Sequence, residues 1–392
     1  MVPIIRIGVN ASEANVAHRV GSNVYAYRLL MELEKISRDI PQDQLQIEWT
    51  IYLPKSQQDD FPERRPGWKY KIIGPSFFWT QWRLPLELFL HTNGMHVFLS
   101  LGHYAPRFCP VPSSICILDL AFLKFPQFFR PKDLMQLRAW TDYSAKKAEL
   151  IFTISKSSKA DIESTYKKNS EDIPIIYPGV DSEKYIKREY LHALDTLEPN
   201  VFTKFLLKEK AYIVAIGTIQ PRKNMVRLLK AFEQLIAKNP SQDTKLVFVG
   251  KPGWMTKEFD DAVAASPIRE RVVVTGFVDD AMKYVILRGS LASVLIGYYE
   301  GFGIPAVESM LYGITPVVAN TASLPEVVGE FGVLVDPFSV DSITRGIEQV
   351  IFNQPDPMRR MQMREWATKF SWVTSSRQML DALVKKFGPE TV

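Results

Sequence analysis

Two glutamates, Glu300 and Glu308, lie eight residues apart on either side of a glycine-rich turn. The turn follows the apolar run Ala292–Ile296, which predicts a strand, and Pro305 suits the first turn of a helix, where its missing N–H costs nothing. The turn itself consists of Gly301, Phe302 and Gly303, whose backbone N–H groups can approach a ligand closely. With Glu308 expected in the first helical turn, this arrangement suits a polyhydroxylated, anionic ligand.

A basic pair, Arg222 and Lys223, follows a second predicted strand, Tyr212–Ile216, and precedes a predicted helix, Met225–Ala237. In a parallel sheet this place is the carboxyl edge, where phosphates commonly bind. Two fixed cations would stabilise the negative charge that a departing diphosphate gains, and they would do so more strongly in the transition state than in the substrate. The sequence holds no Asp-x-Asp pair and no His/Cys ligand cluster, so it indicates no catalytic metal.

These segments resemble the family 4 glycosyltransferases, and among them the bacterial mannosyltransferase-like proteins of glycosyl transferases group 1. Glu300-x7-Glu308 around Gly-Phe-Gly-x-Pro is similar to the family's Glu-x7-Glu signature, and Gly217–Asn224 is similar to its diphosphate-binding loop. Further blocks that agree in order and spacing extend the resemblance over nearly the whole chain: Gly21–Tyr25, Asp119–Phe122, Ile154–Ser158, Tyr177–Asp181, Ser323–Gly329 and Val335–Pro337.

The resemblance implies an enzyme that moves a hexose from a nucleotide diphosphate sugar, of the GDP-mannose or UDP-glucose type, with retention of anomeric configuration. The acceptor would be a glycan, a lipid-linked molecule or a small molecule, and no metal or other cofactor would be needed. Glu308 would hold the ribose hydroxyls, while Glu300 and the backbone of residues 301–303 would contact the sugar. Arg222, Lys223 and Glu300 would form the catalytic group.

The N-terminal half departs from the family pattern at two places. Gly21 corresponds to a glycine expected to contact the donor, but the family's second glycine is replaced by Asn23, so a role in the turn alone stays open. Leu118 stands where relatives commonly have a histidine before Asp119, and leucine cannot hydrogen-bond a sugar. His103, after a predicted strand, is a candidate substitute, with a packing role as the alternative. Asp119 is a candidate acceptor or sugar contact or, alternatively, a loop or cap residue.

An aromatic stretch over residues 77–85 and a second over residues 120–126 are similar to segments of bacterial mannosyl- and rhamnosyltransferase-like proteins. This similarity favours GDP-mannose as the donor. The alternative is that these aromatic side chains fill the core of the N-terminal domain.

Along the chain, apolar, strand-like runs alternate with amphipathic, helix-like runs. This alternation predicts parallel, doubly wound α/β sheets that would position the residues named above. With the resemblance, this alternation predicts a GT-B fold, in which two Rossmann-like domains face each other across a cleft. We assign residues 1–185 to an N-terminal acceptor-side domain, residues 186–370 to a C-terminal nucleotide-sugar domain, and residues 371–392 to a helix that packs back on the first. The charged segment Asp181–Lys210 is interpreted as the connection, and Pro174–Tyr177 as a further strand.

Composition is that of an ordinary globular protein, since 46% of the 392 residues are hydrophobic and 23% are charged. No run of about 18 apolar residues occurs, and the N-terminus lacks the pattern of a signal peptide, so we expect a cytoplasmic protein. Residues 1–180 carry 22 Lys and Arg against 18 Asp and Glu, a mild excess that suits the inner face of a membrane or a phosphorylated acceptor, with an ordinary solvated surface as the alternative. Cys109 and Cys116 are expected to be free, buried thiols. No nucleic-acid partner is expected.

Three other classes of protein are alternatives to a transferase. A nucleotide-sugar epimerase shares the architecture but needs acid and base groups around the sugar ring, and the Glu-x7-Glu block argues against it. A dinucleotide-dependent oxidoreductase lacks its Gly-x-Gly-x-x-Gly loop in either half. A catalytically weak protein that binds nucleotide sugars stays open, because Leu118 replaces the common histidine.

Overall fold

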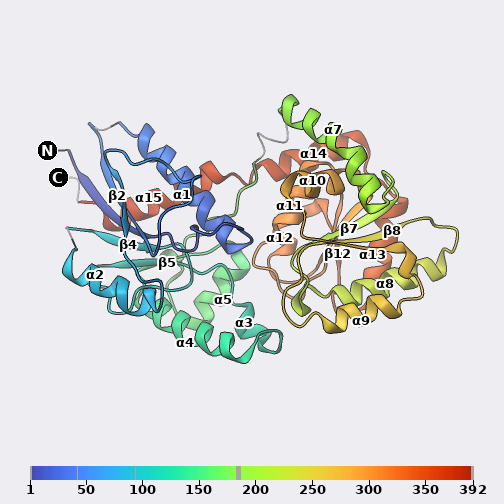
Figure 1. The fold of residues 1–392 in the computed structure, drawn as a ribbon, viewed down its shortest axis with the longest axis horizontal. Helices are drawn as coiled ribbons and strands as arrows, with labels where there is room; N and C mark the ends of the chain where they lie inside the picture. Colours follow the sequence, from blue (N-terminus) through green and yellow to red (C-terminus); the bar gives the residue numbers. More distant parts are fainter. Residues whose placement is uncertain (1, 42, 93, 182–186, 390–392) are drawn as a thin grey trace. The chain divides into compact units, whose positions relative to one another are not determined.

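The chain forms two compact units in a computed structural model that describes residues 2–41, 43–92, 94–181 and 187–389 (Figure 1). The N-terminal unit comprises Met1–Gly179 and Phe370–Val392, and the C-terminal unit comprises Val180–Lys369. The domain boundary predicted at residues 185 and 186 lies outside the described residues.

The N-terminal unit is built on a six-stranded parallel sheet with the order β3-β2-β1-β4-β5-β6. Helices α1 and α15 cover one face, and α2, α4 and α5 lie on the other (Figure 1). A sheet covered on both faces requires apolar residues on both sides of its strands, and the four residues of β4 are all buried. The elements are β1 Ile4–Asn10, α1 Ser22–Asp39, β2 Gln46–Leu53, β3 Trp68–Ile72, α2 Leu84–Leu90, β4 Val97–Ser100, β5 Ser113–Cys116, α3 Ala121–Lys124, α4 Pro131–Lys147, β6 Leu150–Phe152, α5 Lys156–Tyr166 and α15 Trp372–Phe387.

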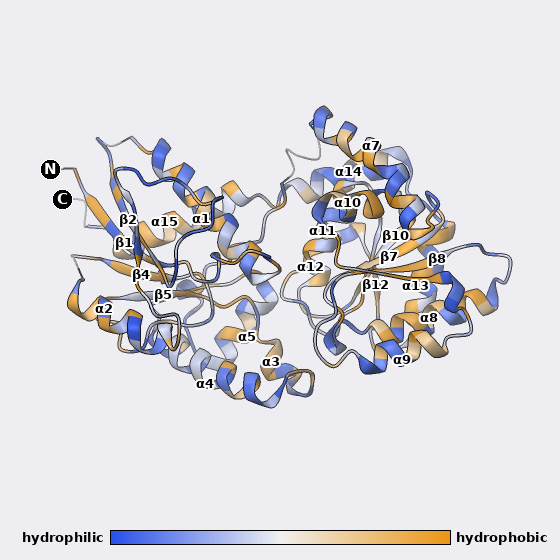
Figure 2. Cartoon of the chain, in the orientation of Figure 1, coloured by the Kyte–Doolittle hydropathy of each residue, from blue (hydrophilic) through white to orange (hydrophobic). Residues whose placement is uncertain are grey.

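The C-terminal unit repeats this plan with the strand order β12-β11-β10-β7-β8-β9, again parallel throughout. Strands β7 and β8 are mostly hydrophobic in Figure 2, and α8 packs its apolar face, including Leu228, Phe232 and Leu235, onto the sheet. The elements are α7 Arg188–Phe205, β7 Tyr212–Ile216, α8 Met225–Lys238, β8 Lys245–Val249, α9 Lys257–Ala265, β9 Val272–Gly276, α10 Asp280–Gly289, β10 Ala292–Leu295, α11 Ile304–Leu311, β11 Pro316–Ala319, α12 Leu324–Val328, β12 Val333–Val335, α13 Val340–Phe352 and α14 Pro357–Thr368.

Each sheet has one point where the strand order reverses, between β1 and β4 in the first unit and between β7 and β10 in the second. In open parallel sheets, ligands bind at the carboxyl ends of the strands at such a point. The predicted class of two doubly wound, Rossmann-like sheets is therefore confirmed. In the C-terminal unit, the topology predicts a ligand site at the loops after β7 and β10.

The C-terminal helix returns to the first unit, as the fold prediction expects. Helix α15 packs against α1, and the rings of Tyr25 and Trp372 lie 5.8 Å apart. A Cβ atom on Gly179 would lie 2.2 Å from the backbone nitrogen of Trp372, so only glycine allows this approach. Ser375 Oγ donates to Tyr177 O at 2.6 Å and fixes the same junction.

Two segments differ from the sequence prediction. Pro174–Tyr177 is not a strand; Ile175 forms an isolated parallel bridge with Thr153, the residue after β6. The segment interpreted as a connection contains the 18-residue helix α7, despite Pro199 in its interior. Buried Leu194 and Val201 lie seven residues apart on one face of α7, which packs against α10 and compensates for the hydrogen bond that proline removes.

The aromatic stretch at residues 77–85 divides between core and surface. Trp79 is buried and donates through Nε1 to Ile73 O at 2.7 Å, whereas Phe77, Phe78 and Trp82 are exposed. Core filling therefore accounts for only part of this stretch.

Within the described residues, no helix is both long enough and apolar enough to cross a membrane.

Cys109 and Cys116 are free thiols, as expected. Burial raises the pKa of Cys109 to about 11, and that of Cys116 still further, so both are protonated at neutral pH. Neither thiol has the low pKa of a nucleophilic cysteine.

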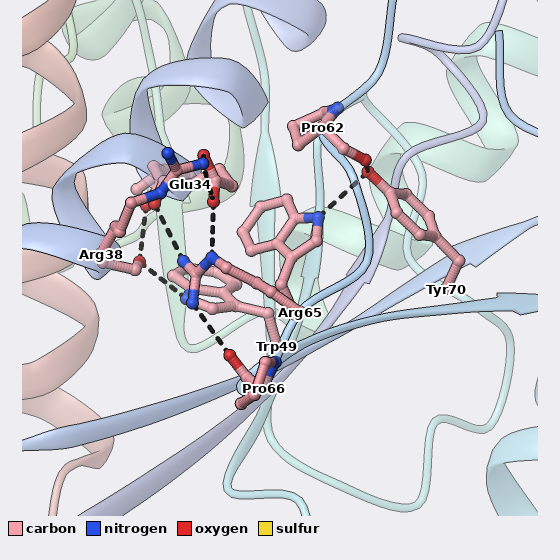
Figure 3. Close-up of polar contacts among 10 residues, drawn as sticks. Glu34, Arg38, Trp49, Pro62, Arg65, Pro66 and Tyr70 are labelled. Carbon is pink, nitrogen blue, oxygen red and sulfur yellow. Dashed lines mark hydrogen bonds and ion pairs between the residues drawn. The ribbon is translucent and has the colours of Figure 1, made fainter. Parts of the chain in front are cut away.

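A buried carboxylate fixes α1 to the loop between β2 and β3 (Figure 3). Arg65 Nε donates to Glu34 Oε1 at 2.6 Å, and Arg38 Nη2 donates to the same oxygen at 2.9 Å. Burial alone would raise the pKa of Glu34, but the hydrogen bonds from Arg65 and Arg38 outweigh it and hold this pKa below its ordinary value. The charged carboxylate therefore stabilises the unit.

We predict that Glu34→Gln lowers the free energy of unfolding by about 1–3 kcal/mol at neutral pH, because it leaves the Arg65 guanidinium without its anion. The pKa is lowered by folding, so the contribution is complete above the unfolded pKa of about 4.3 and disappears as pH falls through the folded value. Urea unfolding followed by tryptophan fluorescence measures both effects. Glu48→Gln, whose partner Arg6 is exposed, is the control and should change stability by less than about 0.5 kcal/mol. Equal effects of the two variants would contradict the prediction.

Candidate functional site

The loops after β7 and β10 bring the basic pair to the first glutamate. Arg222 and Lys223 lie in a short 3-10 helix, Pro221–Lys223, that leads into α8. Glu300 lies in the loop between β10 and α11, and the backbone N–H of Tyr298 in this loop donates to Arg222 O at 3.0 Å. The two loops are neighbours because β7 and β10 pair directly at the point where the strand order reverses.

Lys223 and Arg222, both partly buried, form an ion cluster around the buried Glu300 carboxylate, which we call the Glu300 cluster. Lys223 Nζ lies 2.8 Å from Glu300 Oε1 and 2.9 Å from Oε2, and Arg222 Nη1 lies 3.4 Å from Oε2. Burial alone would raise the pKa of Glu300, which is 5% exposed, but Lys223 and Arg222 outweigh that effect and lower it. Glu300 is therefore ionised at neutral pH, and two cations facing one carboxylate leave the cluster with a positive charge.

Two buried polar side chains hold the loops that carry this cluster. Asn224 has a left-handed backbone (φ 61°), and its Nδ2 donates to Ile296 O at 3.2 Å and to Pro337 O at 2.7 Å. Ser323 Oγ lies 2.7 Å from Glu300 O and 3.0 Å from Phe302 O, so its hydroxyl is shared between two carbonyls. The charged side chains are thus attached to a backbone fixed at several points.

The glycine turn before α11 adopts a conformation that other residues would find strained. Gly303 has φ 103°, and a Cβ atom on it would lie 2.5 Å from Leu324 Cδ2. Pro305 stands in the first turn of α11, as predicted. Gly301 and Phe302 are buried, and the Phe302 ring is only 3% exposed.

Glu308 lies in a second cluster, and its place on the helix differs from the prediction. Because α11 begins at Ile304, Glu308 is in the second turn rather than the first. It is buried, and its Oε1 accepts hydrogen bonds from Lys283 Nζ and from the Tyr284 hydroxyl, each at 3.0 Å. Burial would lower the pKa of Lys283, but Glu308, Tyr284 and Asp280 outweigh it and raise this pKa, so Lys283 stays charged.

Sequence reasoning did not single out Lys283 and Tyr284. They are consecutive residues of α10, the helix before β10, whereas Glu308 is in the helix after it. No periodicity within one element relates the two helices, so only the folded sheet shows that these side chains meet.

Gly21, His103 and Asp119 follow β1, β4 and β5 in the N-terminal unit. Gly21 precedes α1 with φ 51°, and no atom lies within 4 Å of where its Cβ would be, so only its backbone conformation requires glycine. His103 Nε2 accepts from the Leu118 N–H at 3.4 Å, and burial lowers the His103 pKa although Asp119 and Glu13 act in the opposite direction. His103 is therefore neutral, and its buried Nδ1 has no hydrogen-bond partner within the described ranges.

Asp119 adopts a local structural role. Its Oδ1 accepts from the backbone N–H of Ala121 at 2.9 Å, which forms a turn of the Asx type at the start of α3. Its charge also acts on His103, so the two residues are electrostatic neighbours.

We predict that a double-mutant cycle with Lys223→Met and Glu300→Gln gives a coupling free energy of about 1–3 kcal/mol in urea unfolding, because each variant leaves a buried charge with weaker compensation. The control cycle pairs Lys257 with Asp261, an ion pair whose side chains are 84% and 64% exposed. That pair should give less than about 0.5 kcal/mol. A coupling for Lys223 and Glu300 no larger than the control would show that their contact does not stabilise the site.

Comparison with known proteins gives both a family and a fold. The family model described as "Glycosyl transferases group 1" matches residues 198–370. The O-antigen chain mannosyltransferase B of Escherichia coli is 30% identical over 268 residues, which cover 67% of this chain and 68% of the relative. The serotype-specific mannosyltransferase WbdA of Escherichia coli is 24% identical over 61% of this chain, and the match spans only 29% of that protein.

Among solved structures, the Anabaena protein HepE in complex with UDP-glucose matches with a TM-score of 0.68 at 16% identity, covering 97% of this chain and 99% of HepE. At that identity the match shows the fold alone. The match to the mannosyltransferase B extends beyond the C-terminal half and covers two thirds of both proteins. The chain therefore belongs to the glycosyl transferases group 1 family and has the two-domain fold of those glycosyltransferases.

Proposed function

We propose that this glycosyltransferase moves a hexose from a nucleotide diphosphate sugar to an acceptor hydroxyl with retention of anomeric configuration. The supporting observation is the Glu300 cluster, in which Lys223 and Arg222 both contact the Glu300 carboxylate at the carboxyl edge of the sheet. A positively charged cluster at this place suits a diphosphate. The membership in a glycosyltransferase family agrees with that ligand.

In the proposed reaction, the bond between the anomeric carbon and the diphosphate oxygen breaks as the acceptor oxygen attacks from the same face. The acceptor proton passes to the departing phosphate oxygen, so no separate base is needed. Lys223 and Arg222 stabilise the charge that grows on the diphosphate, and this interaction strengthens as the bond breaks. Glu300, held ionised by the same cations, stabilises the positive charge that develops at the anomeric carbon.

The cluster around Glu308 is proposed to bind the nucleotide ribose. Its contacts with Lys283 and Tyr284 both use Oε1, so the lone pairs of Oε2 can accept from vicinal hydroxyls. Lys283 and Tyr284 would act as positioning residues, since they orient the carboxylate without touching the sugar. The sequence suggests Glu308 as the ribose-binding residue, and this arrangement adds the two residues that would hold its carboxylate in place.

A hexose donor of the GDP-mannose type is favoured because both relatives described above are mannosyltransferases, and UDP-glucose is the second candidate because HepE was solved with it. The acceptor is proposed to be a glycan or a lipid-linked glycan, as the O-antigen relative suggests. His103 is proposed to contact the sugar in place of the family histidine that Leu118 replaces.

Incubation of the purified protein with a panel of nucleotide sugars and glycan acceptors tests the proposal. We expect nucleotide release that depends on both acceptor and donor, a product with the donor's anomeric configuration by NMR, and full activity after chelation of divalent metals. Binding without turnover would favour a sensor protein, and conversion of the donor into another sugar would favour an epimerase. Loss of activity with chelator would overturn the proposal that Arg222 and Lys223 suffice for the leaving group.

We predict that Glu308→Ala weakens binding of the nucleoside diphosphate by about 10- to 100-fold, which corresponds to about 1.4–2.7 kcal/mol. The reason is the loss of the acceptor for two hydroxyls. Calorimetry with GDP and UDP measures the change. Glu330→Ala, a largely exposed glutamate of the same unit, is the control and should bind as the wild type does. Unchanged binding by the Glu308 variant would remove this residue from the site.

We predict that Lys223→Gln lowers kcat by about a hundredfold while the donor Kd changes much less, because the charge on the diphosphate is greatest in the transition state. Steady-state kinetics and calorimetry on the same preparations separate the two effects. Lys257→Gln, an exposed lysine in the same unit, is the control. A wild-type turnover rate in the Lys223 variant would refute the charge argument.

A further inference from the structure

One short segment of the N-terminal unit exposes six large hydrophobic side chains, which we call the apolar stripe. Each is more than half exposed, from 53% to 78%. Exposure of single hydrophobic residues is normal, but a contiguous group of this kind marks an interaction surface. The apolar stripe consists of Phe77, Phe78, Trp82, Leu86, Phe89 and Leu90.

The stripe follows the outer face of a continuous helical segment. A π-helical turn, Trp79–Arg83, runs directly into α2, and residues 78, 82, 86 and 89 to 90 recur at the spacing of one helix face. The opposite face is also apolar: Leu84 and Leu88 are fully buried against Tyr52 and Phe98. Figure 2 shows α2 at the edge of its unit with hydrophobic residues along its length. The inner face of the helix packs on the core of the unit. The side chains of the outer face do not contribute to that core, so packing within the unit does not explain why they are apolar.

The charged residues around the stripe are mostly basic. Residues 68–118, which run from β3 through the stripe, contain four lysines and arginines but one acidic residue, Glu87, a net charge of +3. Glu87 is buried and forms ion pairs with Lys71, Arg83 and His91. Lys69 and Arg107 lie outside this cluster, so the outward charge of the segment is positive.

A neighbouring loop adds a further exposed aromatic residue, which also lies next to a cationic residue in the chain. Phe108 is 79% exposed and Arg107 precedes it, while Cys109 and Val111 of the same loop pack on the cluster that contains Leu84 and Leu88. The Phe108 N–H donates to the hydroxyl oxygen of Tyr143 in α4 at 3.0 Å, which attaches the loop to that helix. Aromatic and cationic side chains thus occur together around the stripe.

We propose that the apolar stripe docks on the surface of a bilayer that contains anionic lipids. A helix lying in the interface buries an apolar face with Trp, Phe and Leu among the lipid headgroups, and nearby Lys and Arg bind the anionic headgroups. The stripe and the positively charged segment of residues 68–118 supply both parts. A second copy of this chain is a poor partner, because pairing of the same face would bring two segments of charge +3 together.

Vesicle flotation tests this proposal without donor or acceptor. We expect the wild-type protein to float with vesicles of phosphatidylcholine and phosphatidylglycerol, to bind pure phosphatidylcholine more weakly, and to be released as salt is raised. The double variant Trp82→Ser with Phe89→Ser should bind at least about tenfold more weakly. The double variant Phe352→Ser with Met358→Ser, which changes two comparably exposed residues of the C-terminal unit, should bind like the wild type.

The stripe variant removes exposed side chains only, so its circular dichroism and its nucleotide binding should match the wild type. Absence of vesicle binding by the wild type, or equal binding by the stripe variant, would overturn the proposal. A dimer of the wild-type protein that the stripe variant loses, without vesicle binding, would also overturn it in favour of a second copy. Because nucleotide binding is measured separately, failure of the membrane proposal is distinguishable from failure of the proposed transferase function.

Discussion

The contact between the Lys223 ammonium and the buried Glu300 carboxylate is the interaction on which the candidate site depends. It joins two loops that are 77 residues apart in the chain and that follow neighbouring strands of one sheet. A buried carboxylate without a cation would be neutralised. Glu300 therefore requires Lys223 to stay charged, and Arg222 adds the positive charge that makes the cluster suited to a diphosphate.

The same sheet geometry places the remaining chemistry. Strand β10 leads through one loop to the glycine turn, so Glu300 and Glu308 occur on the two sides of one connection, each paired with a cation from a different element. The first cation comes from the loop after β7 and the second from α10. In the proposed complex, these two charged groups would bind the phosphates and the ribose of one nucleotide. Shared buried hydrogen bonds of Asn224 and Ser323 make this geometry rigid before any ligand arrives.

Much of this could be predicted from the sequence, because apolar runs after turn residues define parallel strands and their carboxyl ends must lie on one edge. That reasoning places Arg222, Lys223 and Glu300 in loops that follow strands of one sheet, whereas the pairing of β7 with β10 comes from the structure. It could not find Lys283 and Tyr284, whose contact with Glu308 depends on how two helices flank β10. It also misjudged Pro199, because packing of Leu194 and Val201 outweighs the local cost of proline in α7. The stretch around Trp82 is apolar on both helix faces, so periodicity alone could not separate buried from exposed residues.

A crystal structure of the protein with GDP or UDP tests the central claim most directly. The account predicts the diphosphate within hydrogen-bond distance of Lys223 Nζ and the Arg222 guanidinium, and the ribose hydroxyls on Glu308 Oε2. A nucleotide bound elsewhere, with Lys223 and Arg222 still engaged by Glu300 alone, would contradict it.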